Sequence, residues 1–165
     1  MRTVTILAPL LLLGGSWPCI APACECGPKP STEEAYAAAA RVFTGRILRV
    51  DTIEAVFDSG AVRKQGYEVS FAVLHGWKGA GRDTIGITTF NTCARFFYDP
   101  TIGDTFLVYA ERWRDPTHVR FVGGHYAAPT RPAEPLTASE CGRTSPVDSA
   151  QADLQWLRGS HGSGH

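Results

Sequence analysis

The sequence predicts a mainly β fold: a small five-stranded barrel with short flanking helices, stapled by two disulfides. Apolar and polar residues alternate in Tyr67–Val73, which is the pattern of a half-buried strand. Further apolar runs follow one another between glycine- and proline-containing turns, without the helix after each strand that a parallel sheet requires. Four cysteines remain once a predicted leader is removed, an even number that suits disulfide pairing in an exported protein.

Residues 1–23 are predicted to be a secretory signal peptide. Arg2 supplies a positive charge, Val4–Leu13 is apolar, and Ala21-Pro22-Ala23 has the small residues of a cleavage site. A membrane anchor is the alternative, but the apolar run has about ten residues where a spanning helix needs about twenty. Cleavage removes 23 of the 165 residues, leaves 142 and makes Cys24 the first residue. A lipid-modified Cys24 is the competing outcome. We expect a secreted, extracellular protein, or a periplasmic one if the source is bacterial.

A short helix is predicted at 31–40, after an extended segment in which Pro28 and Pro30 prevent helix formation. Ser31 and Glu34 have the spacing of a capping box, and the alanines that follow favour a helix.

Five strands are predicted, at 41–51, 67–76, 84–90, 105–113 and 118–123. A long polar hairpin region, 52–65, joins the first two around Asp58-Ser59-Gly60. The segment 51–66 is either a further contact loop or a solvated hairpin tip. Five strands suit a closed barrel of the OB type. A two-sheet sandwich is the alternative, but it usually needs about seven strands.

The chain then continues through a proline-rich loop, 127–135, to a second helix predicted at 148–158. Leu154 and Leu157 lie on one side of this helix. Residues 159–165 are predicted to be a disordered tail. The segment 24–158 is therefore expected to form one OB-fold domain, large enough for its own core.

Composition and motifs argue against several function classes. Lys and Arg equal Asp and Glu at 16 each, so no basic surface for nucleic acid is expected, and no second stretch could span a membrane. His75, His118 and His125 lie on three different elements without a close ligand pair, so no metal of its own is predicted. Ser139 lacks a nucleophile elbow, and Gly79-Ala80-Gly81 lacks the context of a phosphate loop. We expect a monomer that is not an enzyme, has no cofactor and binds another protein.

The cysteines restrict the disulfides to two arrangements. Cys19 lies in the leader, which leaves Cys24, Cys26, Cys93 and Cys141. A Cys24–Cys26 bond would close a very small, strained ring. Both remaining pairings tie the Cys-x-Cys to two distant points of the chain. A metal or redox role for Cys-x-Cys is disfavoured by export and by the absence of a second close cysteine pair.

Several motifs, in order, carry a resemblance to a known family. They are Cys24-Glu25-Cys26-Gly27-Pro28 at the predicted new terminus, Tyr67-Glu68-Val69 leading to Trp77-Lys78-Gly79, Cys93 after a third strand, Phe106–Ala110, and Cys141 before a helix. Together they resemble the inhibitory domain of the tissue inhibitors of metalloproteinases and related netrin-like modules, in a short single-domain form covering most of 24–157.

The resemblance implies a pairing and a mechanism. It pairs Cys24 with Cys93 and Cys26 with Cys141. It implies that the free α-amino group and the carbonyl of Cys24 chelate the catalytic zinc of a target protease, which is therefore the expected partner. A catalytic zinc keeps one position open, which such a chelate occupies. The inhibitory edge implied by the family consists of Cys24, Glu25, Cys26, Gly27, Pro28, Thr92 and Cys93.

Glu25 departs from the family pattern. The family mostly has a small polar residue here, whose side chain enters the specificity pocket of the protease. A carboxylate in an apolar pocket would be desolvated at a cost. This residue favours a target with a basic pocket, or the alternative function of a non-inhibitory, extracellular netrin-like module that binds another protein.

Overall fold

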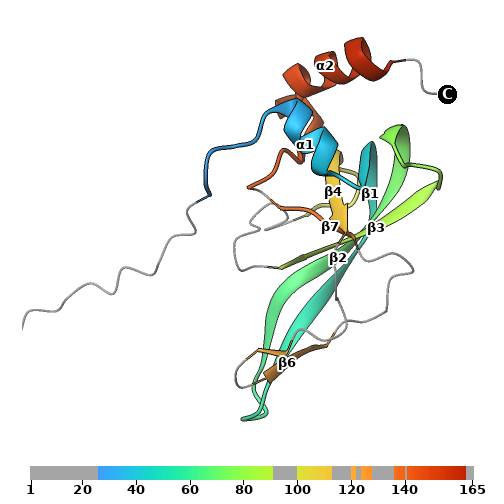
Figure 1. Cartoon of the computed structure of the whole chain (residues 1–165). Helices are drawn as coiled ribbons and strands as arrows, with labels where there is room; N and C mark the ends of the chain where they lie inside the picture. Colours follow the sequence, from blue (N-terminus) through green and yellow to red (C-terminus); the bar gives the residue numbers. More distant parts are fainter. Residues whose placement is uncertain are drawn as a thin grey trace, which may run out of the picture.

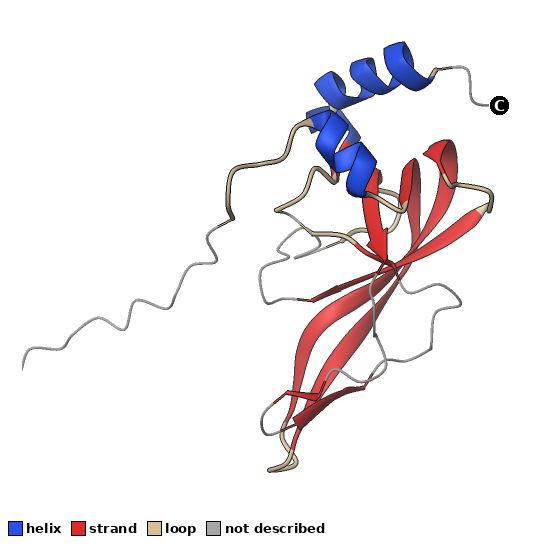
Figure 2. Cartoon of the chain, in the orientation of Figure 1, coloured by secondary structure: helices blue, strands red, loops and turns tan. Residues whose placement is uncertain are grey.

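The structure, a computed structural model, describes residues 26–90, 100–112, 120–121, 124–127, 136–139 and 141–162. In chain order the elements are α1 (Thr32–Ala38), β1 (Arg41–Phe57), β2 (Val62–Lys78), β3 (Thr84–Phe90), β4 (Thr105–Arg112), β5 (Arg120–Phe121), β6 (Gly124–Ala127), β7 (Leu136–Thr137), β8 (Ser145–Pro146), a 3₁₀ turn (Val147–Ser149) and α2 (Gln151–His161). Both helices lie at one end of the strands (Figures 1 and 2). None of the helices in these ranges is long and apolar enough to cross a bilayer.

Five strands close the barrel. Their order is β1-β2-β3-β7-β4, and β4 pairs back onto β1 through Arg41–Arg46. The pairing of β3 with β7 is parallel, at Thr88 and Thr137, and the other pairings in the ring are antiparallel. The predicted fold class, a five-stranded OB-like barrel with flanking helices, is confirmed.

The fifth strand of the ring is not the predicted one. We expected it at 118–123, but the ring is closed by β7, whose two residues follow directly after the proline-rich segment. β5 and β6 instead form a small hairpin outside the ring, and β6 pairs with Glu54–Phe57 at the far end of β1. A two-residue strand has no alternation to detect, and its pairing comes from its neighbours β3 and β4.

The hairpin between the first two strands is also longer than predicted. Strand pairing continues through the polar segment to Val56 and Val62, and only residues 58–61 connect the two strands. Ile53 is buried within this stretch, and pairing with β6 supports the far end of β1. The segment 52–65 is thus mainly strand, and the tip of the long hairpin lies at the opposite end of the molecule from the helices (Figure 1).

The barrel interior and the helical end have separate apolar cores. In the interior, the ring of Phe71 packs edge-on against those of Phe43 and Phe106, with centroids 5.9 and 6.3 Å apart. The second core joins the helices to the barrel end and contains Ala35, Ala39, Val42, Leu107, Tyr109, Ala150, Leu154 and Leu157. This second core fixes both terminal segments to the same end of the barrel.

The second helix is shifted relative to its predicted bounds. Val147–Ser149 form a 3₁₀ turn, and α2 continues three residues past Arg158, the predicted end, into the segment expected to be a disordered tail. The His161 ring stacks on Tyr36 of α1, with centroids 4.1 Å apart and planes at 12°. This contact between the two helices accounts for the three additional residues of α2. An argument from local helix propensity does not include such a contact.

Candidate functional site: the amino-terminal edge

The described part of the predicted edge is an exposed, extended segment before α1. Cys26, Gly27, Pro28 and Lys29 are exposed, and Pro30 is half-buried. The two prolines keep the segment out of a helix. Its backbone is therefore presented to solvent rather than packed against the barrel, although it leads directly into a helix that is packed.

One anchor of the edge is a disulfide. Cys26 is bonded to Cys141, with 5.2 Å between the Cα atoms and a sequence separation of 115. This is one of the two bridges that the family resemblance implies. Cys141 opens the turn 141–143, where its backbone N–H donates to the Ser139 hydroxyl at 3.1 Å. The bridge ties the start of the described chain to the segment that follows β7.

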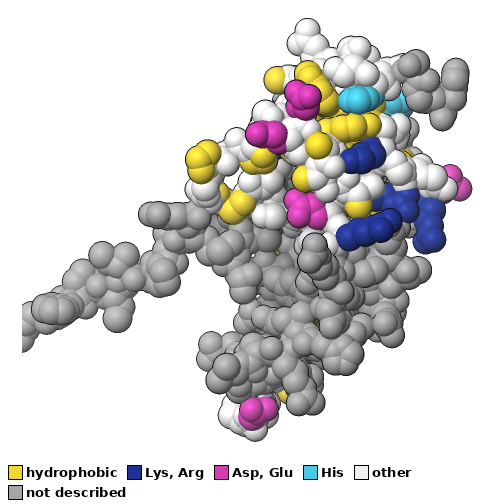
Figure 3. All heavy atoms as spheres, in the orientation of Figure 1, with side chains coloured by type: hydrophobic (Ala, Val, Ile, Leu, Met, Phe, Trp, Pro, Cys, Tyr) yellow, Lys and Arg dark blue, Asp and Glu magenta, His cyan; other side chains and the backbone are white. Residues whose placement is uncertain are grey.

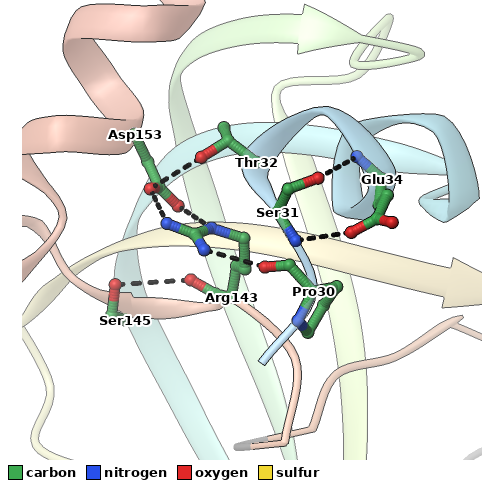
Figure 4. Close-up of polar contacts among 7 residues, drawn as sticks. All are labelled: Pro30, Ser31, Thr32, Glu34, Arg143, Ser145 and Asp153. Atoms are coloured by element: carbon green, nitrogen blue, oxygen red, sulfur yellow. Dashed lines mark hydrogen bonds and ion pairs between the residues drawn. The ribbon is translucent and has the colours of Figure 1, made fainter. Parts of the chain in front are cut away.

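The second anchor is a clamp formed by Arg143 and Asp153 (Figure 4). The Arg143 guanidinium donates to both carboxylate oxygens of Asp153, with 2.7 Å from Nε to Oδ2, and to the Pro30 carbonyl at 2.8 Å. The Thr32 hydroxyl donates to Asp153 at 3.1 Å. The clamp therefore joins the end of the edge, the start of α1 and the first turn of α2.

The electrostatics of the clamp favour the ionised pair. Burial alone would raise the pKa of Asp153, but the hydrogen bonds and the charge of Arg143, with smaller help from Thr32, lower it overall. The hydrogen bond to Asp153 raises the pKa of Arg143. Burial, and then the charge of Asp153, raise the pKa of Tyr109, which packs nearby. All three groups therefore keep one protonation state near neutral pH.

Helix α1, which follows the edge, is fixed at both ends. At its start, the Ser31 hydroxyl accepts from the Glu34 N–H at 3.2 Å and the Glu34 carboxylate accepts from the Ser31 N–H at 2.7 Å, which is the predicted capping box. These Ser31 contacts, the backbone one first, lower the pKa of Glu34. At its end, the Lys78 ammonium of β2 donates to the carbonyls of Tyr36 and Ala37 at 2.7 and 3.0 Å.

The structure brings together only part of the predicted site. Cys26, Gly27 and Pro28 form the described edge. Four predicted site residues lie outside the described residues: Cys24, Glu25, Thr92 and Cys93. The predicted Cys24–Cys93 bridge and the predicted signal peptide therefore also lie outside them. Within the described ranges, no group of three or more potential metal-ligating side chains converges.

Sequence reasoning did not identify the clamp. Arg143 and Asp153 are ten residues apart in sequence. Thr32 and Asp153 are 121 residues apart. One signal was present: Asp153 precedes Leu154 and lies one turn before Leu157, on the apolar side of the predicted helix. An acid on a buried helix face requires a partner, and Arg143 is the nearest preceding cation in the chain.

Comparison with protein-family models and with curated proteins finds no match to this chain.

Proposed function

We propose that this chain is a secreted metalloprotease inhibitor, in which the amine and the carbonyl of the mature N-terminal Cys24 chelate the catalytic zinc of a target protease. The proposal includes export, cleavage after Ala23 and a Cys24–Cys93 disulfide. A neutral amine and the carbonyl of the same residue form a five-membered chelate, which suits the open position of a catalytic zinc.

The observation that carries the proposal is the anchored, exposed edge directly after this terminus. Cys26 is held by Cys141, and the Pro30 carbonyl is held by Arg143. The four residues Cys26–Lys29 between these anchors are nevertheless exposed. A binding segment that is already ordered loses less conformational entropy on association. An edge held at both ends but open to solvent is what a backbone-directed inhibitor requires.

Glu25 determines which proteases the chain is expected to inhibit. The residue after the chelating terminus would enter the specificity pocket, where an unpaired carboxylate is unfavourable. We therefore propose a target whose pocket carries a basic side chain. If no zinc protease is inhibited, the alternative is an extracellular binding module that keeps the barrel and the bridges without the inhibitory activity.

The test is a panel of zinc proteases with both apolar and basic pockets, assayed against the mature secreted protein. N-terminal sequencing first establishes that the chain begins at Cys24. We expect inhibition by the native protein and its loss when one alanine precedes Cys24, because the new amine no longer neighbours the Cys24 carbonyl. An alanine added after His165 is the matched control and should leave inhibition unchanged. Equal inhibition by the extended form would refute the zinc-chelating mechanism.

Glu25→Thr tests the specificity argument separately. The variant should inhibit proteases with apolar pockets better than the native protein does, because a charge is no longer desolvated there. It should inhibit proteases with basic pockets less well. Glu25→Gln, of nearly equal size, separates the effect of charge from that of shape. If the ranking of proteases is the same for all three forms, this side chain does not contact the specificity pocket.

A further inference from the structure

A second surface feature lies along α2, from the turn before the helix to its carboxyl end. It is a groove of about 460 Å³ between α2 and the β1–β2–β4 side of the barrel. The groove is lined by Thr44, Leu74, His75, Trp77, Thr105, Val147, Leu154, Arg158 and Gly162. None of these belongs to the amino-terminal edge, and nothing in the proposed inhibitory mechanism uses them.

An irregularity in β2 builds one wall of the groove. Thr44 of β1 pairs with His75 and Gly45 pairs with Val73, so Leu74 is an extra residue, a β-bulge. Successive strand residues normally point to opposite faces. Here both Leu74 and His75 line the same groove. Leu74 is 54% exposed, although it is a large apolar residue. Bulges of this kind commonly redirect side chains beside functional sites.

The charge of the lining is one-sided. Arg158 and His75 are exposed members of the lining, which contains no Asp or Glu. Across the part of the chain that the structure describes, Arg158 has no ion-pair or hydrogen-bond partner for its guanidinium. The same groove is also lined by apolar side chains, those of Leu74, Trp77, Val147 and Leu154. Figure 3 shows that the face that carries the helices has histidine, basic and acidic side chains among apolar ones.

The size of the groove indicates the kind of occupant. Small-molecule sites have volumes of about 300–1,000 Å³ and are mostly apolar with a few polar groups. A stable protein–protein interface involves about 20–30 residues on each side. Nine lining residues match the first class and fall well short of the second.

We propose that this groove binds a small organic carboxylate with an aliphatic body. The carboxylate pairs with Arg158, and His75 is a second donor beside it. The aliphatic chain lies against Leu74, Trp77 and Val147. Both parts are needed: among the described residues the guanidinium has no other partner, and the exposed Leu74 is otherwise in contact with water.

The experiment is isothermal titration of the mature protein with sodium octanoate, below the concentration at which octanoate forms micelles. We expect saturable binding at one site. Octanamide, which has the same chain without the charge, should bind about tenfold more weakly or worse, because a charge-assisted hydrogen bond is lost. Octylammonium should bind more weakly still, since its charge is repelled by Arg158.

Two exposed positions allow variants that leave the core intact. Arg158→Gln should weaken octanoate binding about tenfold or more and remove the preference over octanamide. Leu74→Ser should weaken octanoate and octanamide alike, by several-fold, because both lose the same apolar contact. Lys29→Gln removes an exposed charge from the amino-terminal edge and should change neither affinity. Circular dichroism establishes that each variant is folded.

The proposal would be overturned by no saturable octanoate binding by the native protein, by equal binding to Arg158→Gln, or by equal binding of octanoate and octylammonium. A loss in Lys29→Gln as large as that in Arg158→Gln would also overturn it, because binding would then follow overall charge. None of these results bears on zinc-protease inhibition, so the two proposals succeed or fail separately.

Discussion

Asp153 illustrates how much a single side chain organises at the helical end. Only 5% of this residue is exposed, yet it is paired with Arg143 and bonded by Thr32. Removing one partner from a buried pair leaves an uncompensated charge, whereas removing both is much less harmful. The clamp is therefore expected to be sensitive to single substitutions and tolerant of paired ones.

Asp153→Asn should destabilise the protein by about 3 kcal/mol, because Arg143 is left partly buried without its counter-charge. Urea unfolding followed by circular dichroism measures the change. Asp148→Asn, at an exposed acid just before the same helix, is the control and should change stability little. The double variant Arg143→Met with Asp153→Leu should recover part of the loss. A double variant that loses as much stability as the single variants Arg143→Met and Asp153→Leu lose in sum would contradict this account.

The same carboxylate should make part of the unfolding free energy sensitive to acid. Its pKa is lowered in the folded state, so its contribution is fully present above the unfolded value of about 3.9 and is lost as pH falls through the folded value. The difference in unfolding free energy between native protein and Asp153→Asn should thus be constant from pH 7 to about pH 5 and shrink below about pH 4. A difference that stays constant down to pH 2.5 would show that Asp153 does not titrate in this way.

At the scale of elements, the sequence predicts strands well where one strand carries its own pattern. Tyr67–Val73 alternates within β2, and β3 has its predicted bounds, Thr84–Phe90. The misses come from pairing between distant segments. β7 is defined by its neighbours, and the far half of β1 is extended by β6. Neither effect is encoded in a local window of residues.

The candidate site also has a part that the sequence predicts and a part that it does not. The family resemblance, carried mainly by the Cys-x-Cys motif after a leader, implies Cys26 to Pro28 as part of the edge. The Arg143–Asp153 clamp was not, because it joins the start of the chain to two elements near its end. Local patterns predict that this segment is extended, whereas the contacts that hold it depend on the closed fold.

Gly76 provides an element-scale test. A Cβ at this strand position would meet the Ala80 side chain far closer than two carbon atoms can approach, since the β2–β3 turn folds back here. Gly76→Ala should cost about 1–3 kcal/mol through overpacking. Gly86→Ala, in β3 where a Cβ meets nothing within 4 Å, is the matched control and should be neutral or slightly stabilising. Thermal unfolding of the two variants compares them; equal melting temperatures would argue against the close approach at Gly76.

Over the whole molecule, the two ends of the chain are built into one unit at the helical end. The bridge, the clamp and the second apolar core all join residues before β1 to residues after β7. Tyr36 of α1 also contacts Trp156 of α2, with ring centroids 5.8 Å apart. The terminal segments should therefore order together at this end of the barrel.

Replacing both Cys26 and Cys141 with serine should lower the unfolding free energy by about 4–5 kcal/mol in the chain-entropy account, since the bridge closes a loop of 115 residues. Urea unfolding of the native and double-serine proteins measures the loss. The barrel strands should remain, with unchanged far-ultraviolet circular dichroism in the absence of urea. A loss below about 1 kcal/mol would mean that the clamp and the helices hold the ends together without the bridge.

The bridge also determines how the protein would respond to mechanical force. If the chain is pulled from its two ends, tension passes from Cys26 through the sulfur–sulfur bond to Cys141, and the barrel strands β1–β7 between them are bypassed. Only the segment after Cys141, with its clamp and α2, would yield at first. After reduction the tension would reach the barrel, and full extension would lengthen the molecule by a further amount on the order of 400 Å, at about 3.3–3.6 Å for each of the 115 residues released.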